Sequence, residues 1–287
     1  MRADRSAPAG LLLDAVAGLP WLAPAASTLA ALARPAGAWP LVRHDPAALA
    51  LLFRSDAAGS LPFPLSLLHD PAPLAFALRR LAEPAAGCAS WDDPALRPVH
   101  EAGWAIARLA SALAKRTGRA DPLRAWCAGL LAPVGWLAVG SLSPERVLDC
   151  WTDPALARDP ARTQERHWGA SAPALARRLA RQWAWPAWLA DAVGRLELPA
   201  AAAARLGGDA SLLALVRLSC RLATHAGHDP ALLPRDEPLD DDASLLGLDL
   251  CALDARELLR SEPLEAGPWQ SPHAAPLLPE VLALAEE

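Results

Sequence analysis

Seven Asp-Pro dipeptides divide this sequence of 287 residues, and most segments between them carry apolar residues at helical spacing. An aspartate carboxylate can accept hydrogen bonds from the free N–H groups of a helix start, and proline fits the first helical turn. Nothing shows sustained period-two alternation of β-branched residues. The pattern predicts an all-α fold, and the irregular gaps between the dipeptides argue against a solenoid repeat. The dipeptides begin at Asp45, Asp70, Asp93, Asp121, Asp153, Asp159 and Asp229.

The composition limits the classes of function. A hydrophobic content of 53% supports a sizeable core, while a formal net charge of −5 and a pI near 5.8 leave no electrostatic footprint for nucleic acid. The five cysteines are odd in number and contain no C-x-x-C pair, which favours reduced thiols over disulfides or a zinc ribbon. Because tyrosine is absent, we expect most of the 12 tryptophans to fill core positions.

The N-terminus superficially resembles a secretion signal, because Arg2 and Arg5 precede an apolar run. Asp14 interrupts that run, and Pro20 and Pro24 break it, so we expect no cleavable signal. No uninterrupted apolar run of about 18 residues occurs, so we also expect no membrane span and a cytoplasmic location.

The central stretch, Asp121 to Gly140, predicts an apolar helix that Pro133 and Gly135 break. Before it, Pro98 to Arg116 has the spacing of an amphipathic helix that ends at Gly118. After it, further helices are expected, and Ser211 to His225 predicts a closing helix.

The segment from Ala128 to Gly135, AGLLAPVG, resembles the centre of HDOD domains, the regulatory relatives of the metal-dependent HD phosphohydrolases. In those enzymes the corresponding piece reads roughly A-G-L-L-H-D-I-G, and its adjacent His and Asp hold the metal. In this chain Ala132 and Pro133 stand at those two positions.

Two further blocks carry the same resemblance in the same order. Near the N-terminus, Leu19 to Pro24 is similar to an L-P-x-L-P turn, and Asp45 to Leu49 is similar to the family's Asp-Pro-Ala-Leu. The later block falls between Gln164 and Leu198, where the family's histidine is replaced by Ala172 or Pro173 and its His-His pair is missing. The matching residues of that block are Glu165, Gly169, Ala176, Leu179, Trp183, Trp185 and Pro186.

The resemblance covers roughly residues 11 to 228 and implies an HD-superfamily-like helical bundle with an N-terminal helical lobe. We expect the lobe at residues 1–95, a degenerate HD-like core at 96–229, and an acidic, Pro-rich C-terminal extension at 230–287. The acidic run from Asp236 to Asp242 is interpreted as a solvated linker.

An HD metal site needs a first His, the adjacent His-Asp pair and a distal Asp, and only His100 remains in a matching position. The resemblance therefore implies no metal, no cofactor and no catalytic residue. The former site, which we call the vestigial pocket, is either filled by Trp104, Trp126 or Trp136 or still open to a small ligand. Its members are His100, Ala128, Ala132, Pro133, Gly135 and Cys220.

Several of these residues have a second interpretation. His100 is either a vestigial site residue or a structural residue near its helix start, and the structural role is favoured. His225 and His228 have the spacing of a metal pair, but a solvated helix end explains them better. Cys127 and Cys220 are a conceivable thiol-sensing pair, although buried cysteine is usually a small hydrophobe.

The function implied by the resemblance is that of a non-enzymatic bacterial signalling module. Such a module passes regulatory input through contacts with a partner such as a kinase, cyclase or phosphodiesterase, with a homodimer as an option. One alternative is a divergent metal-dependent HD phosphohydrolase that acts on nucleotides or phosphodiesters. Another is a helical scaffold without HD ancestry.

Overall fold

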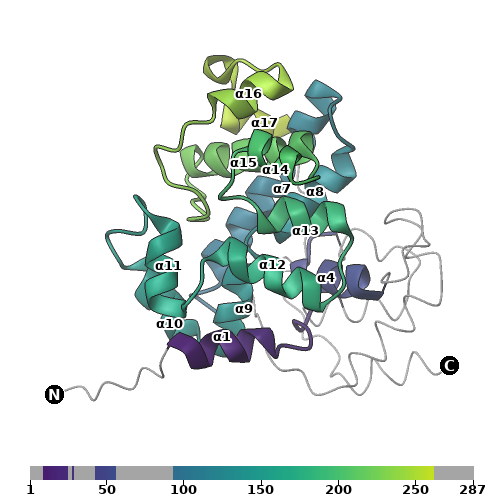
Figure 1. The fold of residues 1–287 in the computed structure, drawn as a ribbon. Coiled ribbons are helices and arrows are strands. Elements are labelled where there is room, and N and C mark those ends of the chain that lie inside the picture. The colour runs from purple at the N-terminus through teal and green to yellow at the C-terminus, as the bar shows by residue number, and fades with distance from the viewer. Residues whose placement is uncertain (1–8, 25–27, 29–42, 56–92, 262–287) are drawn as a thin grey trace.

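The computed structural model describes residues 9–24, 28, 43–55 and 93–261 (Figure 1). The elements among these residues are α-helices and one short 3-10 helix, so the predicted all-α class is confirmed. The elements are α1 (Ala9–Ala17), α4 (Pro46–Ser55), α7 (Arg97–Thr117), α8 (Pro122–Leu131), α9 (Val134–Leu142), α10 (Pro144–Trp151), α11 (Pro160–Trp168), α12 (Ala172–Gln182), α13 (Ala187–Gly194), α14 (Ala200–Arg205), α15 (Ala210–His225), α16 (Asp240–Leu246), η1 (Leu250–Ala252) and α17 (Ala255–Ser261).

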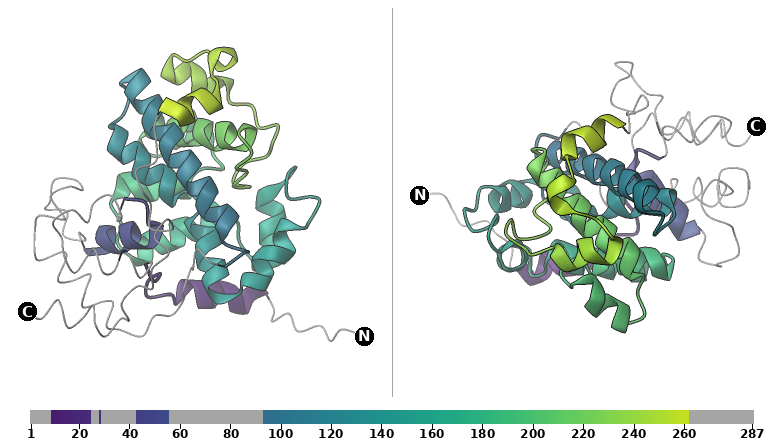
Figure 2. Two further views of the ribbon diagram at one scale, coloured as in Figure 1. Left: turned by 180° about the vertical axis from the view of Figure 1, so that it is seen from behind. Right: turned by 90° about the horizontal axis from the view of Figure 1, so that it is seen from above.

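Helix α7 runs along the length of the bundle, with α1 and α10 towards one end and α16 and α17 at the other (Figures 1 and 2). The sequence predicted it well: the amphipathic helix expected from Pro98 to Arg116 is present, and Gly118 ends it in a left-handed conformation with φ of 63°. The closing helix is also present, as α15. Helices α8, α15 and α17 pack against α7.

Some of the Asp-Pro dipeptides start helices as predicted. Their carboxylates accept hydrogen bonds of 2.8 to 3.1 Å from free N–H groups at the starts of α4, α8 and α11. At Asp153 and Asp229 the carboxylate accepts from the N–H two residues later, but no helix follows directly, so the helix prediction is wrong there. Asp93 closes a similar turn just before α7, and Asp70 lies outside the described residues. The helix-starting residues are Asp45, Asp121 and Asp159.

The central apolar helix breaks after Leu131, but it restarts at Val134 as α9. Pro133 therefore interrupts the helix as expected, whereas Gly135 lies inside α9 and does not break it. Gly135 instead allows the start of α12 to lie close to α9, because a Cβ at Gly135 would lie 2.2 Å from the carbonyl oxygen of Ala172.

Helix α8 returns antiparallel to α7 at very short range. A Cβ at Gly129 would lie 2.8 Å from Cα of Ala107, and one at Gly103 would lie 3.2 Å from the carbonyl oxygen of Leu130. Glycines on both helices thus let the two backbones touch, which larger residues would prevent.

Replacing Gly129 by alanine tests this contact. The new methyl group would meet backbone atoms of α7, which cannot move aside as a side chain can, so we expect a loss of about 1–3 kcal/mol in the free energy of unfolding. Urea denaturation measures it. Gly103→Ala is the matched control with a smaller expected loss, because its nearest contacts are 3.2 and 3.3 Å away. Equal stability of Gly129→Ala and the wild type would contradict the close contact.

The stretch Pro122–Leu142, taken as one helix, has the length and hydropathy of a membrane span, with a mean hydropathy of 1.5. Within its most apolar window, 89% is buried inside the protein. A lipid-facing helix would leave that surface outside the bundle, so the burial favours a core helix, in keeping with the sequence-based expectation of no span.

Tryptophan indoles tie the N-terminal segments to the rest of the bundle. From α7 and α8, Trp104 and Trp126 donate hydrogen bonds to carbonyls in the segment before α4. Just beyond α12, Trp183 and Trp185 donate to carbonyls in the turn after α1 and within α4, both at 3.0 Å. The accepting residues are His44, Arg43, Leu19 and Ala50.

The acidic run expected to be a solvated linker is instead partly built into the fold. Helix α16 packs against α14 and α15, and Asp242 within it is buried. The carboxylate of Asp242 accepts a hydrogen bond of 2.7 Å from Nε of Arg217, and Arg217 also pairs with Glu237 at 2.9 Å. Because Arg217 lies on α15 and is only 1% exposed, the linker interpretation of this run is wrong.

A double-mutant cycle on Arg217 and Asp242 measures this buried pair. Asp242→Ala leaves a guanidinium buried without its nearest carboxylate, and we expect a loss of about 3–5 kcal/mol in the free energy of unfolding. Combining it with Arg217→Met should recover part of that loss, since the only charge then left without its partner is Glu237, which is partly exposed to solvent. Asp191→Ala breaks the more exposed pair with Arg195 and should cost less than about 1 kcal/mol. Additive effects of the two buried changes would contradict the pairing.

Candidate functional site

The vestigial pocket is centred on the face of α7 that meets α8 and the residue after it, Pro133. Gly103 and Ala107 touch this region, Leu96 just before α7 touches α9 at Gly140, and His100 lies in the same stripe, four residues after Leu96 and three before Gly103. Residues at this spacing share one helix face. His100 is 3% exposed, so its ring is directed into the bundle. Both interpretations of His100 are compatible with this burial, so its role stays a prediction.

The positions that hold His and Asp in HD enzymes lie at the junction of α8 and α9. Ala132 follows the last residue of α8 and is fully buried, and the ring of Pro133 packs against the position of Gly103. Ala128 is also fully buried, one turn earlier on α8. The junction is therefore a packed apolar contact with α7.

Cys220, which stands where the distal Asp is expected, lies on α15 and is 1% exposed. Burial raises the pKa of its thiol to about 12, an effect that the nearby Arg217 only partly offsets. Burial also raises the pKa of Cys127 on α8 well above the ordinary range. Both thiols are therefore protonated at neutral pH, which disfavours the thiol-sensing pair.

The residues at the former ligand positions do not fit a divalent metal. Ala132 and Pro133 have no side-chain donor atom, and a protonated thiol is a poor ligand because metals bind the thiolate. Across residues 9–24, 43–55 and 93–261, no group of three His, Cys, Asp or Glu side chains is arranged to hold a metal ion. We therefore derive no metal-dependent step for this site.

The three tryptophans proposed to fill the vestigial pocket make their contacts in two other regions. Trp104 and Trp126 hydrogen-bond to the segment before α4, and His44 meets Trp126 edge to face at 5.3 Å. Trp136 stacks on Trp151 with ring centroids 4.5 Å apart and meets Trp168 edge to face at 4.4 Å. None of these contacts involves a residue of the vestigial pocket, so the role of the three tryptophans in filling it stays a prediction.

Gln164 is a buried polar residue whose role sequence reasoning missed. Its side-chain oxygen accepts from the N–H of Ala172, and its nitrogen donates to the carbonyl of Ala231, both at 2.7 Å. It therefore fixes the start of α12 against α11 and the turn after α15. The only signal in the sequence was a glutamine at an inward position of an otherwise polar helix.

His225 and His228 lie at the end of α15 and beyond it. His225 is exposed in the last turn, and His228 is half-buried after Gly227, whose φ is 96°. This placement agrees with the interpretation as a solvated helix end.

The fold is an all-α, HD-superfamily-like helical bundle. Residues 85–198 match the family model of the HDOD domain, which confirms the resemblance inferred from the sequence. No curated protein matches the sequence.

Solved structures support the same fold. Two crystal structures of the MmoQ response regulator from Methylococcus capsulatus superpose with TM-scores of 0.55 and 0.57 at 22% and 20% identity. They cover 82% and 80% of this chain and 96% and 93% of theirs. A Marinobacter aquaeolei VT8 protein provisionally assigned to signal transduction superposes with a TM-score of 0.51 at 16% identity. The match covers 97% of this chain and 66% of that protein's chain.

The raised thiol pKa values predict a stability that falls at alkaline pH. The unfolded chain loses each thiol proton near pH 8.5, whereas native Cys220 keeps its proton up to about pH 12. Between these values the native state binds more protons, so the free energy of unfolding should fall by about 1.4 kcal/mol per pH unit for this thiol.

Urea denaturation from pH 8 to 11 measures this slope, and Cys220→Ala should reduce it by about that amount. The chain suits the experiment because it has no tyrosine and a single lysine, Lys115, to titrate in the same range. Cys251→Ala is the control, since that cysteine is exposed. An unchanged slope in Cys220→Ala would contradict the protonated, buried thiol.

Proposed function

We propose that this chain is a non-enzymatic bacterial signal-transduction module that acts in the cytoplasm through protein–protein contacts. The observation that carries the proposal is the replacement of the metal-binding pair by Ala132 and Pro133 at a fully buried helix junction. His100 alone cannot hold a catalytic metal, because an HD centre draws ligands from several helices. The HDOD domain and the fold shared with a response regulator support a regulatory role.

The partner proposed is a regulatory protein such as a kinase, cyclase or phosphodiesterase module. Nucleic acid is disfavoured by the net charge of −5. A homodimer is compatible with this function, and sedimentation of the purified chain over a range of concentrations would test it.

The main alternative is a divergent HD phosphohydrolase that acts on nucleotides or phosphodiesters with other ligands. It requires acidic residues that converge on His100, and the described residues hold no group of three metal-ligating side chains. The second alternative, a scaffold without HD ancestry, is set aside because residues 85–198 match the HDOD family.

Elemental analysis of the full chain separates regulation from hydrolysis. Manganese, iron and zinc are offered during preparation, and hydrolysis of bis(p-nitrophenyl) phosphate and of nucleotides is followed. We expect neither stoichiometric metal nor turnover above a blank, and no change in either on His100→Ala. Metal at one equivalent that disappears in His100→Ala, together with turnover, would overturn the proposal.

A further inference from the structure

A hollow of about 420 Å³ lies between α1 and α12, outside the vestigial pocket. Its volume is within the range of small-molecule sites, about 300–1,000 Å³. One part of its lining is apolar, from Leu13 on α1, Ala170 before α12, and Ala174 and Leu175 within α12. The remaining lining is basic, from Arg177, Arg178 and Arg181.

The arginines share one side of α12, because Arg181 follows Arg177 by four residues and Arg178 by three. All are exposed, and none of the guanidinium groups makes an ion pair or a hydrogen bond with a residue that the structure describes. The stem of Arg177 packs against α13, because a Cβ added at Gly194 would lie 2.5 Å from the Cβ of Arg177. Three uncompensated cations around one hollow contrast with the net negative charge of the chain.

The orientation of α12 adds to the positive potential. Ala170 and Ala174 place the hollow beside the first turn of this 11-residue helix, where the helix dipole is positive. Ser171 and Gln164 already accept from the N–H groups of Ala174 and Ala172, so the arginine side chains are the donors available to a ligand. Planar guanidinium groups match phosphate oxygens in pairs and also stack on flat rings.

We propose that the hollow between α1 and α12 binds a phosphorylated small molecule with a flat, apolar portion, such as a nucleotide. The arginines bind the phosphates, and the apolar surface formed by Leu13 and Ala174 contacts the ring. This site does not depend on the proposed function, because binding is measured on the purified chain whatever its partner.

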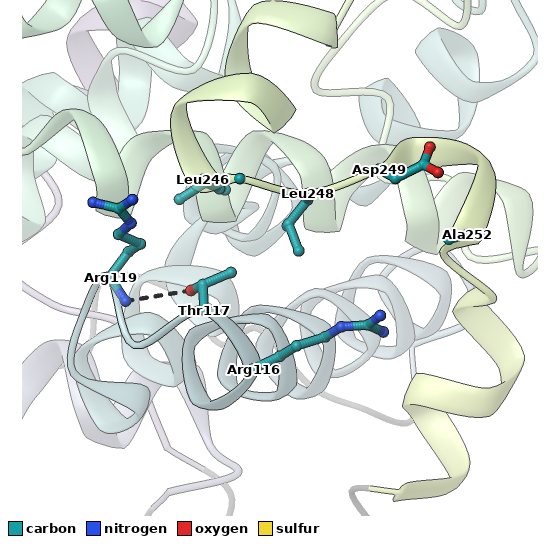
Figure 3. A pocket seen from close by; sticks show the side chains of 8 residues that line it. Arg116, Thr117, Arg119, Leu246, Leu248, Asp249 and Ala252 are labelled. Carbon is teal, nitrogen blue, oxygen red and sulfur yellow. Dashed lines mark hydrogen bonds between the residues drawn. The ribbon is translucent and has the colours of Figure 1, made fainter.

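A second hollow, of about 470 Å³, supplies a comparison (Figure 3). It lies between the end of α7 and the segment from Leu246 to Ala252, and its cations are Arg116 and Arg119. The two side chains point away from each other, and the carboxylate of Asp249 belongs to the same lining (Figure 3). Divergent cations beside an acid suit an anion less well, so this hollow serves as the control.

Isothermal titration calorimetry of the full chain with ADP, pyrophosphate and adenosine tests the proposal. We expect ADP to bind most tightly, pyrophosphate more weakly and adenosine weakest, with the affinity for ADP falling as salt is raised. The variant Arg177→Gln/Arg178→Gln/Arg181→Gln should bind ADP at least about tenfold more weakly, and Arg116→Gln/Arg119→Gln should change it by less than about twofold. Since all five arginines are exposed, both variants should fold, which circular dichroism checks.

Ala174→Phe separates the two parts of the site, because it fills the apolar portion and leaves the charges intact. This variant should bind ADP more weakly than the wild type does and should bind pyrophosphate with unchanged affinity. The proposal is overturned if neither ADP nor pyrophosphate binds at about 5 mM in low salt. It is also overturned if both arginine variants lower the affinity for ADP by the same factor. Binding of a synthetic helical peptide rich in Glu and Leu in place of both ligands would also overturn it and assign the surface to a protein partner.

Discussion

The structure depends on the short-range contact between α7 and the antiparallel helix α8. Glycine at positions 103 and 129 removes the side chains that would otherwise separate the two backbones. In α9, a Cβ at Gly140 would lie 2.1 Å from the side chain of Leu96, just before α7. Buried backbone contact of this kind gains dispersion energy over many atoms and tolerates few alternatives. It also fixes the level at which His100 faces the α8–α9 junction. The same contact that stabilises the bundle thus decides what surrounds the former site.

That contact explains how the former ligand positions can be lost without loss of the fold. In an HD enzyme the polar side chains of a His and an Asp at this junction point towards the metal. In this chain Ala132 and Pro133 occupy those positions and pack into the apolar core. Removing polar groups from a buried position removes the cost of desolvating them, provided that the space is filled. The buried, protonated thiol of Cys220 continues the same change on α15. An apolar interior at this point supports the proposal made above that surfaces, rather than the interior, act in signalling.

Local patterns predicted much of the fold, and long-range contacts account for what they missed. The spacing around Ile106, the left-handed Gly118 and the cap at Asp121 act within a few residues, so the sequence alone displays them. Gly135 and Asp242 were misinterpreted because their partners, Ala172 and Arg217, lie far along the chain. A glycine that breaks a helix and a glycine that admits a neighbouring backbone look the same in sequence. An acidic run likewise gives no sign that one of its members is paired inside the protein. The former site was found through the resemblance, since a set of missing ligands can be recognised only against a pattern.

Helix α12 connects the parts of the molecule that a signal would have to link. Its first residues meet α9 at Gly135, a member of the vestigial pocket, and its outer side carries the arginines. At its other end, Gln182 and Trp183 both donate to the carbonyl of Leu19, each at 3.0 Å, and so hold the turn after α1. A ligand that fills the hollow between α1 and α12 would therefore act on a contact shared by the N-terminal segment and the core. Coupling between sites requires a ligand that binds two arrangements with different affinity. The junction of α1 and α12 is the place where such a difference would arise, because a ligand there touches both helices and its charge is unmatched by any described residue.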